Sequence, residues 1–349
     1  MDETAFRILD VLSRDPGGGI SISALSRDIK RLHGTAYYSN VYNALHRLER
    51  DGIVRLTKAG HSSLASLNLR NRQTIDALSE MELQRRRSLL AKREDLRRLF
   101  DSLSDTPSMG PASLIDAERN MKLNRAELLI QIPEGMSSTG AEALRARLDD
   151  LEGRLNVRID ALILDERGFL SLLAAPDKNA LKEMLSRRTA LFAPDLFWSR
   201  IRNAWAHGIR IQFDREETDP AKVTERDLVH NLARFGYSEI GTSPKDGRDL
   251  GIEYLVAAVL LKGDARRIQA IPVILAKNPA EYDLLLFLAK KYGVQGQLYG
   301  LLRVLAKHDG NQALQHALRV VGNARVKEVL ANEAGIEEMM RTYNAIPQP

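Results

Sequence analysis

Residues 1–70 show an order of apolar and polar positions that predicts three short helices followed by a hairpin. The first helix covers 5–13 and should end before PGGG, because a proline and three glycines favour a turn. Ser21 or Ser23 can cap the second helix, and Gly34 should end it. The segment DGIVRLTKAGHSSLASLNL alternates apolar and polar residues on both sides of its Ala-Gly pair, which predicts two antiparallel strands.

The third helix, within AYYSNVYNALHRLERDGIV, has the clearest division into two sides. At about 100° per residue, one side gathers the apolar residues that should face the core, namely Tyr37, Val41, Ala44, Leu45 and Leu48. The opposite side carries Ser39, Asn43, His46 and Arg50, flanked by Asn40, Tyr42 and Arg47. A helix side that only meets solvent usually carries pairs of Glu and Lys. These side chains instead suit hydrogen bonds with base edges and phosphates.

Positive charge is concentrated in the same region. The whole chain has a formal net charge of +5 and a pI of about 9.3. Residues 27–70 contain an excess of five cations, which equals the excess of the whole chain: Arg27, Lys30, Arg31, Arg47, Arg50, Arg55, Lys58 and Arg70 against Asp28, Glu49 and Asp51. An anionic partner of this region is therefore expected.

Three helices followed by a hairpin resemble the winged-helix family over about residues 4–70, including the ending VYNALHRLERDGIV. In that family the third helix enters the major groove of DNA and the hairpin, or wing, touches the backbone. The resemblance implies that the third helix contacts bases and phosphates through Tyr38, Ser39, Asn40, Tyr42, Asn43, His46, Arg47 and Arg50. The wing contacts would be Arg55, Lys58 and His61. Winged helices also bind proteins, so that alternative stays open.

The segment 71–104 predicts one long helix of about 50 Å, because 71–103 contain neither glycine nor proline. Apolar residues fall near heptad a and d positions, but three charged residues interrupt the series: Glu82, Arg85 and Lys92. Two interpretations follow. The segment is either a dimerisation helix that forms a homodimer or a helix packed on the next domain of its own chain.

Residues 105–215 show strand, helix, strand and helix patterns, which predict a small mixed sheet backed by helices. The order, with LLIQIPEG as its most similar segment, resembles the nucleotidyltransferase fold, especially archaeal-type proteins that join a winged helix to such a domain. Active members of that family hold phosphate in a Gly-Ser turn. Two Asp residues, one residue apart on the next strand, hold Mg²⁺ on the same side of the strand.

This chain departs from that pattern at each signature position. Gly110 is followed by Pro111 instead of Ser, Arg125 stands where the first Asp belongs, and Glu127 replaces the second. Asp160 could match a third carboxylate. Because a guanidinium cannot bind a metal ion, we expect a degenerate domain without a catalytic residue. Glu127 and Asp160 are the metal candidates if the site is active with Mg²⁺, and surface or strand-edge charges if it is not.

Residues 216–349 read as helices throughout and predict a helical bundle that could carry a protein partner. Cysteine is absent from the chain, which excludes disulfides and thiolate metal sites. Neither a signal-peptide pattern nor an apolar run of about 20 residues occurs, so a cytoplasmic protein without a membrane partner is expected. The predicted fold class is α+β and mainly helical, with four parts: 1–70, 71–104, 105–215 and 216–349.

The leading functional prediction is a DNA-binding protein, a dimeric transcription regulator that recognises double-stranded DNA. Two alternatives belong to other classes. One is a Mg²⁺-dependent nucleotidyltransferase recruited through its winged helix, and the other is an antitoxin-like adaptor of a toxin pair.

Overall fold

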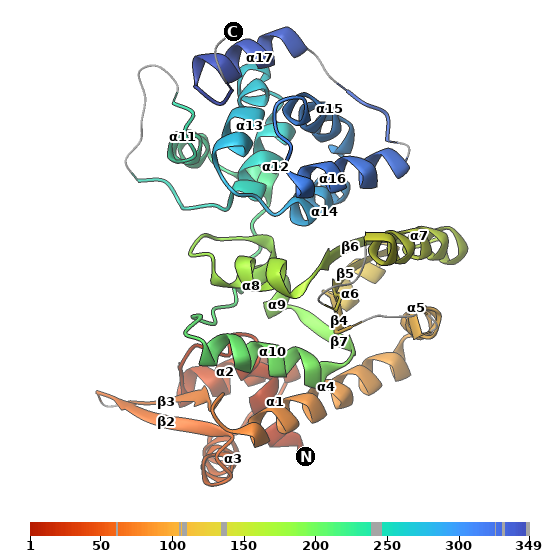
Figure 1. Ribbon diagram of the computed structural model, residues 1–349. Helices are drawn as coiled ribbons and strands as arrows, with labels where there is room; N and C mark the ends of the chain where they lie inside the picture. Colours follow the sequence, from red (N-terminus) through yellow and green to blue (C-terminus); the bar gives the residue numbers. More distant parts are fainter. Residues whose placement is uncertain are drawn as a thin grey trace. The chain divides into compact units, whose positions relative to one another are not determined.

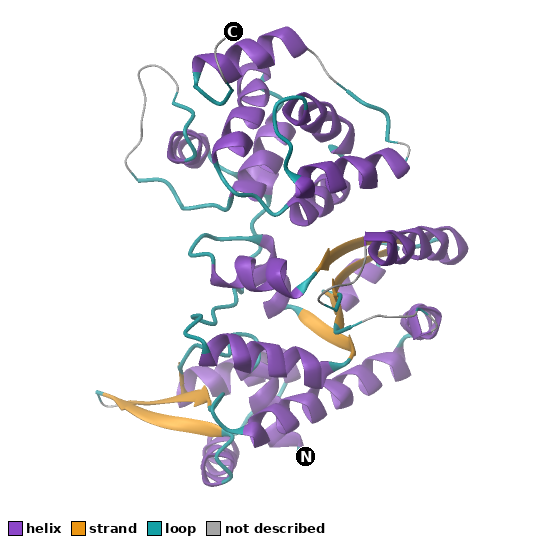
Figure 2. Cartoon of the chain, in the orientation of Figure 1, coloured by secondary structure: helices purple, strands orange, loops and turns teal. Residues whose placement is uncertain are grey.

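The chain is an α+β protein with mainly helical structure (Figures 1 and 2). The computed structural model describes residues 1–60, 62–104, 106, 110–133, 138–238, 246–324, 326–329 and 332–346. It divides into two compact units. Unit 1 comprises Met1–Ser137, Ala143–Ala174 and Leu181–Glu216, and unit 2 comprises Ser138–Glu142, Ala175–Ala180 and Glu217–Pro349. In the described part, no helix combines the length and the apolar character needed to cross a membrane.

The N-terminal module of unit 1 contains the predicted helices and hairpin. Its helices are α1 (Glu3–Leu12), α2 (Ile22–His33) and α3 (Tyr38–Arg50), and its strands are β1 (Ile20–Ser21), β2 (Val54–Ala59) and β3 (Ser62–Leu67). The strands form an antiparallel sheet in the order β1-β3-β2. Ser21 caps α2 by accepting a hydrogen bond from the N–H of Ala24, and Gly34 ends it at a φ of 81°.

The three helices bury a common apolar core, in which Ile8, Leu25, Ile29, Val41 and Leu45 have almost no exposed surface.

The prediction that Tyr37 faces this core was wrong. It lies before the first turn of α3 with extended backbone angles, and 71% of its surface is exposed. Because Tyr37 is outside the helix, the 100° spacing does not apply to it.

The predicted single helix over 71–104 is interrupted. It forms α4 (Arg72–Lys92) and α5 (Glu94–Ser104), separated by the extended residue Arg93. The guanidinium of Arg93 binds the carboxylate of Asp95 across the break, at 2.6 and 3.0 Å. Glu94 and Asp95 also suit the first turn of a new helix, where the helix dipole favours negative charge.

Six apolar residues of α4 and α5 are buried inside unit 1, namely Ile75, Leu78, Met81, Leu96, Leu99 and Leu103, whereas Leu83, Leu89, Leu90 and Phe100 are half-buried. Helix α4 contacts α1, α10 (Pro194–Ala206) and β7 (Arg188–Phe192) of the same chain. The packing of 71–104 on its own chain is therefore observed. A homodimer through this segment stays a prediction and would have to use its other residues.

The remainder of unit 1 is built on a four-stranded mixed sheet. Its strands are β4 (Ala112–Ile115), β5 (Arg125–Gln131), β6 (Arg158–Leu164) and β7, in the order β6-β5-β4-β7. Strands β5 and β6 are parallel and the other pairs are antiparallel. The helices between the strands are α6 (Ala117–Met121), α7 (Ser138–Leu155), α8 (Glu166–Ala174) and α9 (Ala180–Ser186), and α10 follows β7.

A buried ion pair joins α4 to β7. One guanidinium nitrogen of Arg188 lies 2.7 Å from Oε1 of Glu82, and both side chains are almost completely buried. The other carboxylate oxygen accepts a hydrogen bond from the N–H of Ala190. The guanidinium also lies over the rings of Phe197 and Trp198, 4.1 and 4.6 Å from their centres. Burial lowers the pKa of Arg188 to about 10, and the charge of Glu82 limits this fall.

A second buried cluster centres on Asp10 of α1. Its carboxylate lies 3.1 Å from the guanidinium of Arg85 and 3.1 Å from Nε2 of His33, with Arg14 at 3.5 Å. Burial alone would raise the pKa of Asp10, but Arg85, His33 and Arg14 together hold it well below its usual range. Since Arg85 belongs to α4, this cluster ties the N-terminal module to the helix that packs on the sheet.

The chain after α10 returns to the N-terminal module. A Cβ on Gly17 would lie only 1.8 Å from the carbonyl oxygen of Ile211, so this position of the PGGG turn needs glycine for close approach. The N–H of Phe213 donates to Asp15, and Arg215 pairs with Asp28 at 2.9 Å.

The described residues of unit 2 from Glu217 onward form helices joined by loops. After the short 3-10 helix η1 (Pro220–Lys222) it contains α11 (Glu225–Arg234), α12 (Ile252–Lys262), α13 (Ala265–Lys277), α14 (Tyr282–Tyr292), α15 (Gln295–Ala306), α16 (Gln312–Asn323) and α17 (Glu333–Thr342). Helix α12 is buried along nearly its whole length and contacts α11, α13 and α14. It forms the centre of this domain.

The buried ion pair leads to a prediction about stability. Arg188→Met would leave the carboxylate of Glu82 buried without its partner, so the free energy of unfolding should fall by about 3–5 kcal/mol. The double variant Glu82→Leu, Arg188→Met removes both charges and should lose less than Arg188→Met alone. Urea unfolding followed by tryptophan fluorescence measures both effects. A double variant that loses as much as Arg188→Met alone, or more, would contradict this account.

The Asp10 cluster leads to a prediction about pH. The pKa of Asp10 is lower in the folded protein than its value of about 3.9 in an unfolded chain. The ionised carboxylate of Asp10 therefore makes its full contribution to the free energy of unfolding above about pH 5. This contribution is lost as the pH falls below about 4 and the carboxylate is protonated. The difference in free energy of unfolding between wild type and Asp10→Asn should shrink over that range. Asp76→Asn, at an exposed position of α4, is the control, and an equal change in both variants would refute the role of Asp10.

Candidate nucleic-acid interface

The outer side of α3 is exposed as the sequence predicts. Ser39, Asn40, Asn43 and Arg50 are all exposed, whereas Val41, Ala44, Leu45 and Leu48 on the inner side are buried. Within the described chain, none of those four exposed side chains has a hydrogen-bond or ion-pair partner. In Figure 1, α3 is drawn below α1, with the β2–β3 hairpin extending beside it.

Aromatic rings line one flank of this side. Tyr38 and Tyr42 are stacked with ring centres 6.2 Å apart, and the ring of His46 meets Tyr42 edge-on at 4.4 Å. The spacing of four residues places all three on the same flank of the helix. Tyr38 and Tyr42 are 55% and 42% exposed, so their hydroxyls remain accessible to a partner.

Glu49 connects this flank to the wing. One oxygen of its carboxylate accepts a hydrogen bond from the N–H of Leu56 on β2, at 3.3 Å. The other oxygen lies 3.2 Å from Nδ1 of His46. In the sequence, Glu49 stands out only as one of three acids in a basic region. Its role could have been suspected from the spacing of three residues to His46, but the bond to Leu56 depends on how the wing folds.

Arg47 lies on the other flank and already forms an ion pair within the chain. Its guanidinium pairs with Asp2 at 2.7 Å, and both side chains are about half exposed. The second oxygen of Asp2 caps α1 by accepting from the N–H of Ala5. An exposed ion pair of this kind contributes little stability, so a phosphate could compete for Arg47.

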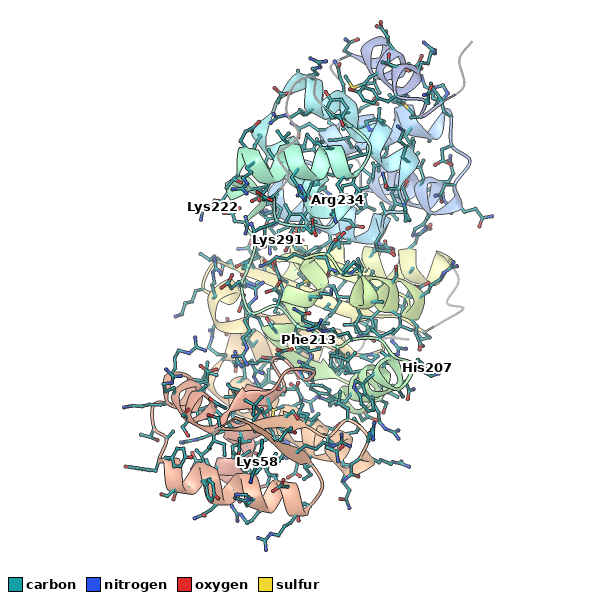
Figure 3. The ribbon with its side chains drawn as sticks, turned by 90° about the vertical axis from the view of Figure 1, so that its left-hand side faces the viewer. Lys58, His207, Phe213, Lys222, Arg234 and Lys291 are labelled. Atoms are coloured by element: carbon teal, nitrogen blue, oxygen red, sulfur yellow. The ribbon has the colours of Figure 1, made fainter. Side chains whose placement is uncertain are left out.

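The wing contributes two further cations. Arg55 and Lys58 are exposed on β2, opposite Ser66 and Ser63 of β3 (Figure 3 labels Lys58). In the parts of the chain that the structure covers, neither has an ion-pair partner. His61, the third predicted wing contact, lies outside the described residues.

The sheet brings three of the predicted nucleotidyltransferase positions together. Glu127 and Asp160 are register partners on β5 and β6. Nε of Arg125 lies 2.6 Å from Asp160 and 3.6 Å from Glu127, and Arg158 adds a second guanidinium at 3.2 Å from Asp160. Both carboxylates are almost completely buried, so neither is a surface charge, although Asp160 does lie on the edge strand β6. The guanidinium of Arg125 gives both carboxylates a charged partner, which allows their burial.

The structure does not bring Gly110 to these carboxylates. A Cβ on Gly110 would lie 2.2 Å from the carbonyl oxygen of Gln131, and Pro111 accepts a hydrogen bond from the N–H of Gln131. Gln131 ends β5 six residues beyond Arg125, which corresponds to about 20 Å along a strand. Gly110 therefore packs against the far end of β5, and the guanidinium of Arg125 occupies the space beside the two carboxylates.

No group of three or more His, Asp or Glu side chains in the described residues is arranged to hold a metal ion. Neither a protein-family model, nor a curated protein, nor a solved structure matches the chain. The interpretation of the α3 side and of the sheet cluster therefore depends on their own geometry.

The sheet cluster leads to a prediction about metal binding. Because two guanidinium groups already neutralise Glu127 and Asp160, the chain should show no saturable binding of Mn²⁺ or Mg²⁺ and no nucleotidyl transfer to protein or nucleic acid. Calorimetric titration and labelled nucleoside triphosphates test the two parts. Transfer that Glu127→Ala abolishes would show instead that the cluster is an active site.

Proposed function

We propose that this chain is a DNA-binding protein that inserts the outer side of α3 into the major groove of duplex DNA. The β2–β3 hairpin then lies along the phosphate backbone. The observation that carries the proposal is the free polar side of α3, because Ser39, Asn40, Asn43 and Arg50 are exposed without partners in the described chain. Polar side chains held on a rigid helix are suited to read base edges.

The dimensions of α3 fit this role. Its 13 residues give a length of about 20 Å, and an α-helix of ordinary width enters a groove of about 12 Å. Asn43 lies at the middle of the exposed side, where it can bind adenine through two hydrogen bonds. The hydroxyls of Tyr38 and Tyr42 on the flank can donate to phosphates.

The cations around α3 supply the electrostatic attraction to the phosphates of the DNA. Arg50 at the end of the helix and Arg55 and Lys58 on the wing are exposed and without ion-pair partners in the described residues. Each phosphate that such a cation neutralises releases counterions, so binding weakens as the salt concentration rises. A transcription regulator that acts as a homodimer would place two α3 helices on a two-fold symmetric site.

A selection experiment tests this proposal. The full chain should enrich a defined sequence from a random duplex library, and Asn43→Ala should lose the preference at one position, at a cost of about 1–3 kcal/mol. Arg50→Ala should weaken binding to all duplexes and reduce the slope of log K against log salt by about one. Fluorescence anisotropy with labelled duplexes measures both effects.

The matched control is Arg266→Ala, which removes the same charge from an exposed position of unit 2. Equal effects of Arg50→Ala and Arg266→Ala would mean that binding is not located on α3. The absence of duplex binding at low salt would refute the proposal and favour a protein partner for this side.

A further inference from the structure

We propose that Glu49 is a positioning residue that fixes the proton of His46 on Nδ1, and that His46 then selects an amino-bearing base in the bound DNA. This inference rests on the proposed function, since it assigns one element of sequence preference to the α3 side. It is carried by two contacts on the His46 ring, from Glu49 and Tyr42 of α3, and by a third contact that anchors Glu49 to the wing.

The first step is the anchoring of Glu49. Its Oε1 is engaged by the N–H of Leu56 at 3.3 Å, which leaves Oε2 in place 3.2 Å from Nδ1 of His46. Because the anchor is a backbone group of β2, the carboxylate is held by the wing as well as by its own helix. The pair is accessible, with the side chains of His46 and Glu49 42% and 39% exposed.

The second step is the state of the ring. An ionised carboxylate only accepts hydrogen bonds, so the nitrogen that faces it carries the proton. A neutral imidazole protonated on Nδ1 presents Nε2 as an acceptor. Within the described chain Nε2 of His46 has no partner. The edge contact with Tyr42 at 4.4 Å limits rotation of the ring.

The third step is the place of His46 on α3. It lies three positions after Asn43 and four positions before Arg50, so it shares their exposed side. An acceptor there pairs with N4 of cytosine or N6 of adenine, which are the amino groups of the major groove. A duplex with cytosine or adenine at that position is thus the preferred ligand, over guanine or thymine.

The decisive variant is Glu49→Gln. The side-chain oxygen of glutamine can still accept from Leu56, and its amide group then donates to Nδ1 of His46. The ring proton must move to Nε2, which becomes a donor suited to O6 or N7 of guanine, O4 of thymine and N7 of adenine, whereas cytosine offers no acceptor in the major groove. A variant that merely disturbs the structure would lose preference, whereas this one should reverse it.

Selection from a random duplex library at about pH 8, where imidazole in water is neutral, compares four proteins. Wild type should favour cytosine or adenine at one position by about three- to tenfold, which corresponds to one hydrogen bond. Glu49→Gln should reject cytosine and accept guanine, thymine or adenine at that position, and His46→Ala should show no preference there. Asp76→Asn makes the same charge change at an exposed position of α4 and should behave as wild type.

Nitrogen-15 NMR of the histidine rings gives a second readout that needs no DNA. The Nε2 signal of His46 is identified as the one that disappears in His46→Ala. In wild type this signal should be that of an unprotonated nitrogen. In Glu49→Gln it should be that of a protonated nitrogen. Unchanged preferences and unchanged ring signals in Glu49→Gln, with sequence-specific binding by wild type, would overturn this inference and leave the proposed function standing. A wild-type chain that binds no duplex would overturn both.

Discussion

The separation of α3 into a buried apolar side and an exposed polar side is the constraint on which the functional account depends. The inner side of α3 packs into the core of the N-terminal module through Val41, Ala44, Leu45 and Leu48. The helix therefore cannot rotate about its axis without exposing these side chains to water. Burying these side chains is worth several kcal/mol by the usual measure of about 25 cal/mol per Å². The same packing that stabilises the module therefore keeps Asn43 and its neighbours at the surface.

Two buried charged groups connect this module to the rest of unit 1. The pair between Glu82 and Arg188 joins α4 to the sheet, and the cluster of Asp10 with Arg85 joins α1 to α4. A buried charge that loses its partner costs several kcal/mol. Each of these two groups of charges therefore favours the one arrangement of helices and strands in which its members stay paired. A helix at the surface of such a scaffold presents its side chains in a fixed geometry, which favours specific recognition over adaptable contact.

Local patterns predicted the helices and hairpin of residues 1–70 and the residues on the outer side of α3, because both depend on spacing within one element. The break at Arg93 and the exposure of Tyr37 were missed, since capping and backbone angles decide them. Strand β7 and the burial of Glu127 depend on which strands become neighbours, which periodicity does not reveal. The role of Glu49 was missed for the same reason, because its anchor is on β2.

The proposed function requires the outer side of α3 to contact duplex DNA. Hydrogen–deuterium exchange of the full chain, with and without a random-sequence duplex at low salt, tests it most directly. The DNA should slow amide exchange in α3 and β2. The exchange rates of α12, the central helix of unit 2, should stay unchanged. Slower exchange confined to unit 2, or none in α3, would contradict it.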